Sequence, residues 1–276
     1  MAYTEFYTRT TGSDMNGGSS NADAAAYTST NGNWDGTSVF TPTDASTPAS
    51  SVSAGDSASV YIDGATTPVY VARVTAVAAG VNGAITLSTT ATSGTAPTSS
   101  ATTRSIKVGG AWKGPNGATF HPFNFIKNTL TDSSSNIPRV NLVATATYSI
   151  TAVINHNLAG PVVFQGCTSS AADGGKVTID GTTAGASYNL LSVGGSASVM
   201  TIRDIIFQNN GASGFATGVT LGGSLVTIER CVVNNVRGNG MSCSSSTTFI
   251  ECEAYACNKA VTTNVGGFLA SVFACF

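Results

Sequence analysis

The chain has 276 residues, of which 42% are hydrophobic and only 9% are charged, and its formal net charge is −2. Extensive disorder needs fewer apolar residues and more charge, and nucleic-acid binding needs a basic surface, so the composition argues against both. Abundant Ser, Thr, Gly, Ala and Val favour many short strands joined by tight turns. The sequence therefore predicts an all-β protein.

Residues 1–50 are predicted to form an opening strand and an irregular cap, because turn residues dominate and the larger apolar residues are scattered aromatics such as Phe6, Trp34 and Phe40. Residues 13–17 (SDMNG) carry several side-chain oxygens that could hold a calcium ion, but a plain Asx-type turn is the favoured interpretation.

The N-terminus has neither the positive region nor the apolar region of a signal peptide. No window reaches the roughly 18 apolar residues of a membrane span. We therefore expect synthesis in a cytoplasm and no membrane partner.

Residues 51–104 contain short β runs separated by Asp63-Gly64 and Asn82-Gly83, which favour tight reversals because these residue types tolerate positive φ. This pattern predicts a small antiparallel meander or barrel. A Ser/Thr-rich linker follows it.

Residues 105–276 show internal repeats. Ile202, Ile228, Ile250 and Val272 align at spacings of 26, 22 and 22 residues, and Gly218-Val219, Gly240-Met241 and Gly267-Phe268 form a second aligned set. A period near 22 with two apolar clusters is the size of one coil of a parallel β-helix. A leucine-rich repeat has a similar length, but the aligned positions are not leucines. The aligned isoleucines and valine are expected to point inward.

Polar residues also recur within the repeats. Asn209, Asn210, Asn234, Asn235 and Asn258 are expected to stack at corners as side-chain amide ladders. Arg203, Glu229 and Glu251 stand beside the aligned aliphatic residues, where a solvated face is the default interpretation; there Arg203 and Glu229 are expected to form a salt bridge, and Glu229 and Glu251 a repulsive contact.

The six cysteines are Cys167, Cys231, Cys243, Cys252, Cys257 and Cys275. Several fall inside strand-like runs, so they are predicted to be buried reduced thiols. Zinc is disfavoured because no histidine lies near Cys252 and Cys257.

These features resemble the right-handed parallel β-helix proteins of the pectate-lyase-like superfamily, especially phage and metagenomic members. The residues that carry the resemblance are Phe6-Tyr7, Thr11-Gly12-Ser13-Asp14 and Gly17, the runs 162–166 (VVFQG) and 177–181 (VTIDG), and Phe207-Gln208-Asn209-Asn210. The resemblance covers residues 105–276 for the helix and 1–20 for the cap. It implies a right-handed parallel β-helix (solenoid), which the small antiparallel β domain predicted for residues 51–104 would precede.

The superfamily includes polysaccharide lyases, glycoside hydrolases and virion tailspikes, so fold does not choose among them. Sugar hydrolysis needs two carboxylates on one surface, and the family's lyases use a basic residue beside a carboxylate-bound metal. The candidates are Asp173, Asp180, Asp204, Glu229, Glu251 and Glu253, with Lys176, Arg203, Arg230 and Arg237. Glu229 and Glu251 would lie one coil apart, about 4.8 Å, but no partner motif accompanies them. His121 and His156 suit surface or turn roles better.

We therefore assign no catalytic, cofactor or metal residue, and expect a non-catalytic phage virion protein: a capsid decoration, head fibre or tailspike-like subunit assembled in the host cytoplasm. Expected partners are capsid or tail proteins and further copies of the chain, for which a trimer is one form. A host surface glycan is a further candidate. A polysaccharide lyase or glycoside hydrolase is the alternative. Because the repeat is still in register at Phe276, we also expect either a longer polypeptide or a covering subunit.

Overall fold

The computed structural model describes residues 3–13, 16–66, 68–89, 93–114, 137–157, 161–169, 171, 173–182, 188–194, 199–210, 216–222, 225–243, 247–257, 259–263 and 269–271. The one helical element in these ranges is a single 3₁₀ turn, η1 (Pro48–Ser50). Within the described ranges, no helix has the length and apolarity needed to cross a membrane. The prediction of an all-β protein is confirmed.

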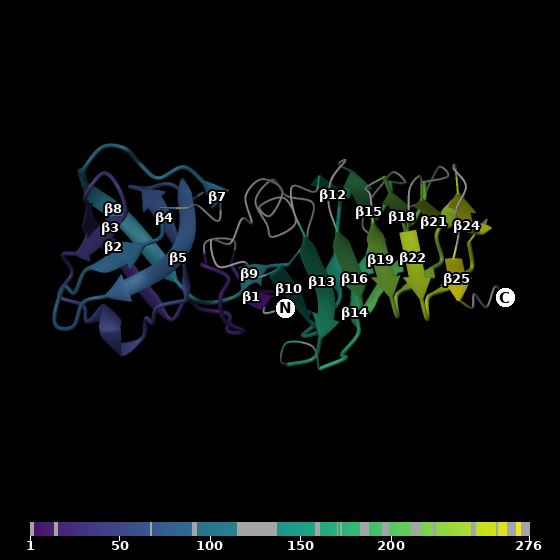
Figure 1. The fold of residues 1–276 in the computed structure, drawn as a ribbon, viewed down its shortest axis with the longest axis horizontal. Coiled ribbons are helices and arrows are strands. Elements are labelled where there is room, and N and C mark those ends of the chain that lie inside the picture. Colours follow the sequence, from purple (N-terminus) through teal and green to yellow (C-terminus); the bar gives the residue numbers. More distant parts are fainter. Residues whose placement is uncertain are drawn as a thin grey trace.

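Three parallel sheets form one part of the molecule (Figure 1). The first sheet contains β1 (Tyr3–Arg9), β9 (Trp112–Lys113), β10 (Ile137–Val143), β13 (Val162–Cys167), β16 (Met200–Arg203), β19 (Val226–Glu229), β22 (Thr247–Ile250) and β25 (Leu269–Ser271). The second contains β11 (Tyr148–Ser149), β14 (Val177–Asp180), β17 (Ile205–Gln208), β20 (Val232–Asn234) and β23 (Glu253–Tyr255). The third contains β12 (Ile154–Asn157), β15 (Leu191–Gly194), β18 (Val219–Leu221), β21 (Asn239–Cys243) and β24 (Lys259–Thr263).

From β10 onward the chain visits these sheets in turn, and one such passage is called a coil below. Buried and half-exposed residues alternate in β16 and β19, as expected for strands with one face on a core. The inward residues of all three sheets form one apolar cluster, which includes Phe164, Ile202 and Ile228. Burial of these side chains is the main force that holds the coils together.

The register of the inward column differs from the predicted one at its third member. Ile202 pairs with Ile228, as predicted, but Ile228 pairs with Phe249. Phe249 is buried, whereas Ile250 points outward and is 37% exposed. The prediction for Ile250 is wrong because the coil is one residue shorter than the sequence alignment assumed, and a one-residue shift moves a side chain to the opposite face of a strand. Val272 lies outside the described residues.

The second aligned set is confirmed for its first pair, because Val219 lies opposite Met241. The next residue in that column is Val261 in β24. Gly267-Phe268, which the alignment placed there, lies outside the described residues.

Residues with positive φ mark two corners of the coils. The corner between the first and second sheets holds Asp204, Arg230 and Glu251, with φ of 58°, 50° and 50°. The next corner holds Asn209, Asn235 and Ala256, with φ of 54°, 50° and 52°. A single left-handed residue turns the chain sharply, and Asn and Asp tolerate this conformation better than most residues. Glu251 therefore belongs to a corner and not to a strand.

The other part of the molecule is a closed antiparallel barrel with β7 added at one strand. Its strands are β2 (Tyr27–Trp34), β3 (Val39–Pro42), β4 (Ser57–Ile62), β5 (Tyr70–Val77), β6 (Ile85–Leu87), β7 (Ser93–Gly94) and β8 (Ala101–Val108). Pairing of β4 with both β8 and β5 closes the barrel. Gly64 and Asn82 have positive φ in the two predicted reversals, which do connect antiparallel strands.

Strand pairing crosses both predicted domain boundaries. β2 and β3, which the sequence assigned to a cap within 1–50, pair with β8 and β6 of the barrel. β1 instead lies between β9 and β10 of the first sheet. The barrel is thus inserted between two neighbouring strands of one parallel sheet. The division into 1–50, 51–104 and 105–276 remains a prediction about domains.

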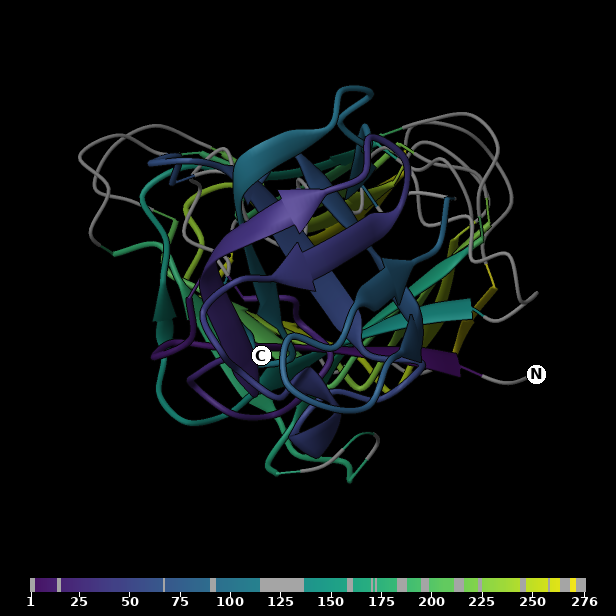
Figure 2. The same cartoon turned by 90° about the vertical axis from the view of Figure 1, so that its left-hand side faces the viewer.

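The barrel packs against the end of the parallel-sheet region (Figures 1 and 2). Val71 of β5 is buried in the same apolar cluster as Phe6 and Trp112, whose rings stack with centroids 5.2 Å apart. The main-chain oxygen of Asn16 accepts hydrogen bonds from Trp112 Nε1 at 2.7 Å and from Ser59 Oγ of β4 at 3.0 Å. The wall of β4 and β5 therefore covers the first strands of the sheet stack.

Candidate functional site

The outward face of the first sheet carries a chain of polar side chains across β1, β10, β13 and β16. Asn141 donates to Glu5 Oε2 at 2.7 Å, Gln165 donates to Asn141 Oδ1 at 2.6 Å, and Arg203 Nε donates to Gln165 Oε1 at 2.8 Å. Arg139 Nε also donates to Glu5 Oε2, at 3.0 Å. Asn141 and Gln165 are fully buried. Each hydrogen bond in this series is donated towards Glu5, from Arg203 to Gln165 to Asn141. The series therefore stabilises the stacking of these four strands.

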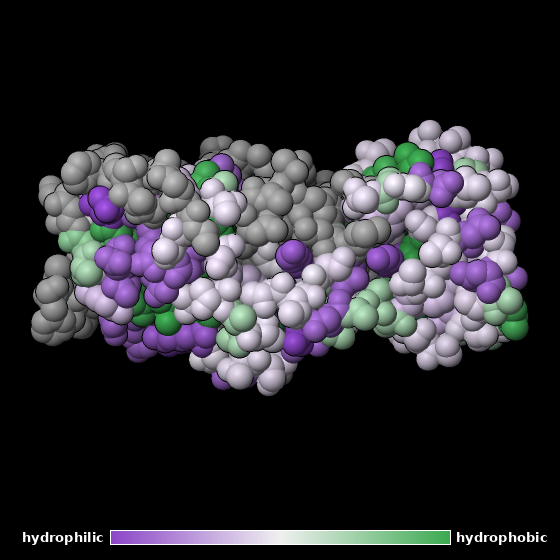
Figure 3. Space-filling model, turned by 180° about the vertical axis from the view of Figure 1, so that it is seen from behind, coloured by the Kyte–Doolittle hydropathy of each residue, from purple (hydrophilic) through white to green (hydrophobic). Residues whose placement is uncertain are grey.

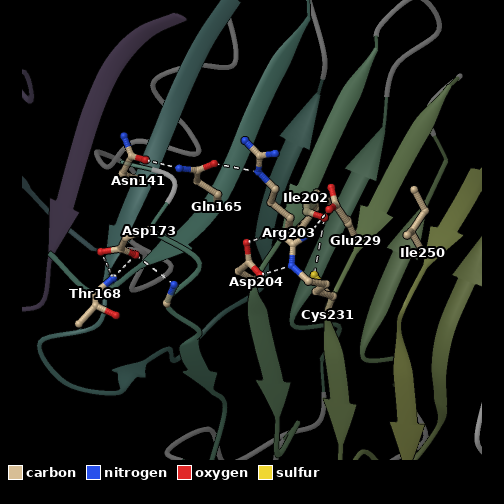
Figure 4. A network of polar contacts seen from close by, with 12 residues as sticks. Asn141, Gln165, Thr168, Asp173, Ile202, Arg203, Asp204, Glu229, Cys231 and Ile250 are labelled. Atoms are coloured by element: carbon tan, nitrogen blue, oxygen red, sulfur yellow. Dashed lines mark hydrogen bonds and ion pairs between the residues drawn. The ribbon is translucent and has the colours of Figure 1, made fainter. Parts of the chain in front are cut away.

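A second polar cluster occupies the corner that follows β16 and β19. Arg230 donates to Asp204 through Nε and Nη2, both at 2.7 Å, and also pairs with Glu229. Hydrogen bonding to Asp204 is the main cause of the raised pKa of Arg230, with the charges of Asp204 and Glu229 adding to it. Figure 4 shows this corner beside the Asn141–Gln165–Arg203 chain. The predicted register of Arg203 with Glu229 is confirmed, but Glu229 forms its ion pair with Arg230.

A third cluster contains part of the predicted amide ladder. Asn235 donates to Asn209 Oδ1 at 2.7 Å, and Asn209 in turn donates to Asp180 Oδ2 at 2.9 Å. Gln208 donates to the same carboxylate oxygen at 2.7 Å. Desolvation opposes ionisation of Asp180, but hydrogen bonds from Thr182, Gln208 and Asn209 outweigh it and lower the pKa. The ladder is therefore structural and begins at a carboxylate.

Asn210 belongs to the same corner but makes different contacts. It is buried, and its Oδ1 accepts a hydrogen bond from the main-chain nitrogen of Arg237 at 3.0 Å. Asn234 lies in β20, and Asn258 lies outside the described residues.

The predicted carboxylate pair is not formed by the fold. The residue opposite Glu229 on the next coil is Ile250, and Glu251 follows at the corner. The prediction that Glu229 and Glu251 stack in a repulsive contact is therefore wrong. The coil is one residue shorter than the alignment assumed, and this difference displaces Glu251 as well as Ile250. Their carboxylates are not opposed members of one column.

The remaining candidates for sugar chemistry are spread over the molecule. Asp173 accepts hydrogen bonds from the main-chain nitrogens of Thr168, Ser169 and Gly175 at 2.7 to 3.0 Å, which is a turn-stabilising role. The exposed residues Lys176, Arg237 and Glu253 come from three different segments. His156 belongs to β12, and His121 lies outside the described residues.

Four cysteines, Cys167, Cys231, Cys243 and Cys252, are buried as predicted, and Cys257 is partly buried. Burial raises the pKa of each of the four, to about 12 for Cys167. Cys275 lies outside the described residues. Within the described part of the chain, no three His, Cys, Asp or Glu side chains gather in a way that could hold a metal ion.

Asn16, in the segment considered for calcium, is buried and makes hydrogen bonds to the main chain. The side-chain amide of Asn16 donates to the main-chain oxygens of Asp23 and Ala111, both at 2.8 Å. Asp14 and Met15 lie outside the described residues. Asn16 thus links the barrel and the first sheet through buried hydrogen bonds. Sequence reasoning missed this role because the partners of Asn16 lie up to 96 positions away.

Glu5, Arg139, Asn141 and Gln165 were also missed by sequence reasoning. The inserted barrel separates Glu5 from the other three residues, and Gln165 is 38 residues from its partner Arg203, so no fixed period relates the members of this hydrogen-bond chain.

Comparison of the chain with protein-family models, curated proteins and solved structures finds no match.

Proposed function

We propose that this chain is a non-catalytic structural subunit of a bacteriophage particle, built as a right-handed parallel β-helix whose first strands are covered by an inserted barrel. The observation that carries the proposal is the packing of Val71 and the β4–β5 wall on Phe6 and Trp112. This contact joins the apolar interior of the parallel sheets to the wall of the barrel. A barrel packed on the end of a stack of sheets suits an appendage or decoration on a particle.

The right-handed sense of the helix is proposed from a general rule for connections between parallel strands. Successive strands such as β16 and β19 are parallel neighbours in one sheet, connected through strands of the other two sheets. Crossover connections between parallel strands of one sheet are right-handed in about 98% of cases.

The hydrogen bonds and ion pairs of the candidate carboxylates favour a structural role over glycan cleavage. Asp173, Asp180 and Asp204 accept hydrogen bonds from groups of the fold itself, and Glu229 pairs with Arg230. A general acid or nucleophile must instead direct its oxygens at substrate. Over the barrel, the face seen in Figure 3 consists mostly of pale, weakly polar residues, which fits contacts with other proteins of the particle more than attraction of a charged polymer.

Cryo-electron microscopy of phage particles assembled with this chain tests the proposal. We expect density for the barrel and the sheet stack at a capsid or tail position, and loss of that density when the gene is deleted. Particles whose composition and structure are unchanged by the deletion would reject the virion role. Release of reducing or unsaturated ends from host surface glycan by the purified chain would instead establish the enzyme alternative.

A further inference from the structure

The outward face of β16 and β19 is self-complementary. Outward residues in equal positions on the two strands pair in register: Thr201 with Thr227, and Arg203 with Glu229. Immediately before the strands stand Val199 and Leu225. The face thus has three columns, an apolar one, a hydroxyl one and a charged one, and the charged column changes sign between β16 and β19.

We infer that this face binds the same face of a second copy of the chain, about a two-fold axis that runs along the strand direction midway between β16 and β19. Rotation about such an axis keeps each position along the strand and exchanges the two strands. Arg203 of one copy then opposes Glu229 of the other. Thr201 of one copy opposes Thr227 of the other, and Val199 opposes Leu225. A closed two-fold contact requires this kind of self-complementarity.

The apolar column supplies a second, independent reason. Val199 and Leu225 are 51% and 59% exposed, although each directly precedes a buried strand residue, Met200 or Val226. Leu225 also has a φ of 56°, in the left-handed region that disfavours a leucine. Neither burial within the chain nor backbone preference explains leucine here, whereas contact with another copy would bury it.

The charged residues are held in place for such a contact. Arg203 is fixed through Nε by Gln165, and Glu229 is fixed by its ion pair with Arg230. Orientation by internal hydrogen bonds reduces the side-chain entropy that a contact with another protein would otherwise cost. This inference goes beyond the proposed function and holds whether or not the chain belongs to a phage particle.

Charge exchange between two variants of the full chain tests the inference. Sedimentation velocity of the wild-type chain should show a dimer whose fraction rises with concentration. Arg203→Glu makes the charged column entirely acidic and Glu229→Arg makes it entirely basic, so each variant alone should stay monomeric where the wild type dimerises. An equal mixture of the two variants should form a heterodimer, because each opposed pair then carries opposite charges.

Leu225→Asp serves as a second variant. Asp tolerates the left-handed conformation better than Leu, so the monomer should melt like the wild type, while the dimer is lost. A wild-type chain that stays monomeric, or that sediments as a trimer, would overturn the inference. So would a variant mixture without heterodimer when both variants melt like the wild type. These results leave the particle reconstruction, which tests the proposed function, unaffected.

Discussion

Asp204 and Arg230 occupy the same corner on neighbouring coils, both with positive φ, and are joined by two hydrogen bonds of 2.7 Å. Asp204 is almost fully buried, whereas the side chain of Arg230 is 35% exposed. The pair links a strained backbone position on one coil to the same position on the next. It therefore offers a direct measure of how much side-chain contacts between corners stabilise the stack.

Asp204→Ala is expected to lower the free energy of unfolding by about 1–2 kcal/mol, because Arg230 loses its two charge-assisted hydrogen bonds but retains Glu229 and solvent. Glu251→Ala is the matched control, since it puts alanine at the same left-handed corner, with φ of 50°, where the side chain is exposed. The control should change the free energy by about 0.5 kcal/mol or less. Urea unfolding of the three proteins measures the difference, and equal effects would contradict it.

Ile228→Asp is expected to unfold the parallel-sheet region, at a cost of at least about 4 kcal/mol, because it buries an unpaired charge in the core. Ile228 is fully buried, whereas Ile250 on the next coil is 37% exposed. Ile250→Asp should therefore cost only about 0.5 kcal/mol. Circular dichroism melting distinguishes the two variants. If Ile250→Asp is as damaging as Ile228→Asp, the register of β22 is incorrect.

The buried thiols are expected to react slowly with alkylating reagents in the folded protein. Burial raises the pKa of Cys167, Cys231, Cys243 and Cys252, and the reactive thiolate is therefore scarce at neutral pH. Mass spectrometry without reductant should find six alkylated cysteines after denaturation. Rapid labelling of Cys231 in the native protein, or a mass that indicates a disulfide, would refute the expectation.

Asp35 is expected to make barrel stability depend on acid pH. Desolvation opposes its ionisation, but hydrogen bonds from Val39, Thr37 and Ser38 prevail and lower its pKa from 3.8 to about 2. A lowered folded-state pKa means that the stabilisation is complete above pH 3.8 and is lost as pH falls through about 2.

Asp35→Asn is the comparison that isolates this residue. The melting temperature of the wild type should exceed that of the variant at pH 5, and the difference should shrink as pH is lowered towards 2. A difference that stays constant across this range would show that the carboxylate charge is not the source of the stabilisation.

The alternation of residues in β16 and β19 could be predicted from the sequence because it depends on local periodicity alone. The runs around Ile202 and Ile228 each place buried residues at every second position, and their paired register follows from the repeat. The reversals at Gly64 and Asn82 could also be predicted, since a tight turn is a property of two or three residues. The same holds for the burial of Cys167 and Cys243, which lie within β13 and β21.

Other features depended on contacts that no local pattern encodes. Whether Phe249 or Ile250 faces the core is decided by the length of one corner, since strand periodicity allows both choices. The placement of β1 between β9 and β10, and the Glu5–Asn141–Gln165–Arg203 chain built on it, join residues more than a hundred positions apart. Such pairings depend on which strands meet in the folded chain. The sequence alone thus determined strand content, turns and the inward faces of β16 and β19, whereas the tertiary structure decided the register of β22, the insertion of the barrel and the grouping of charges on the face of β16 and β19.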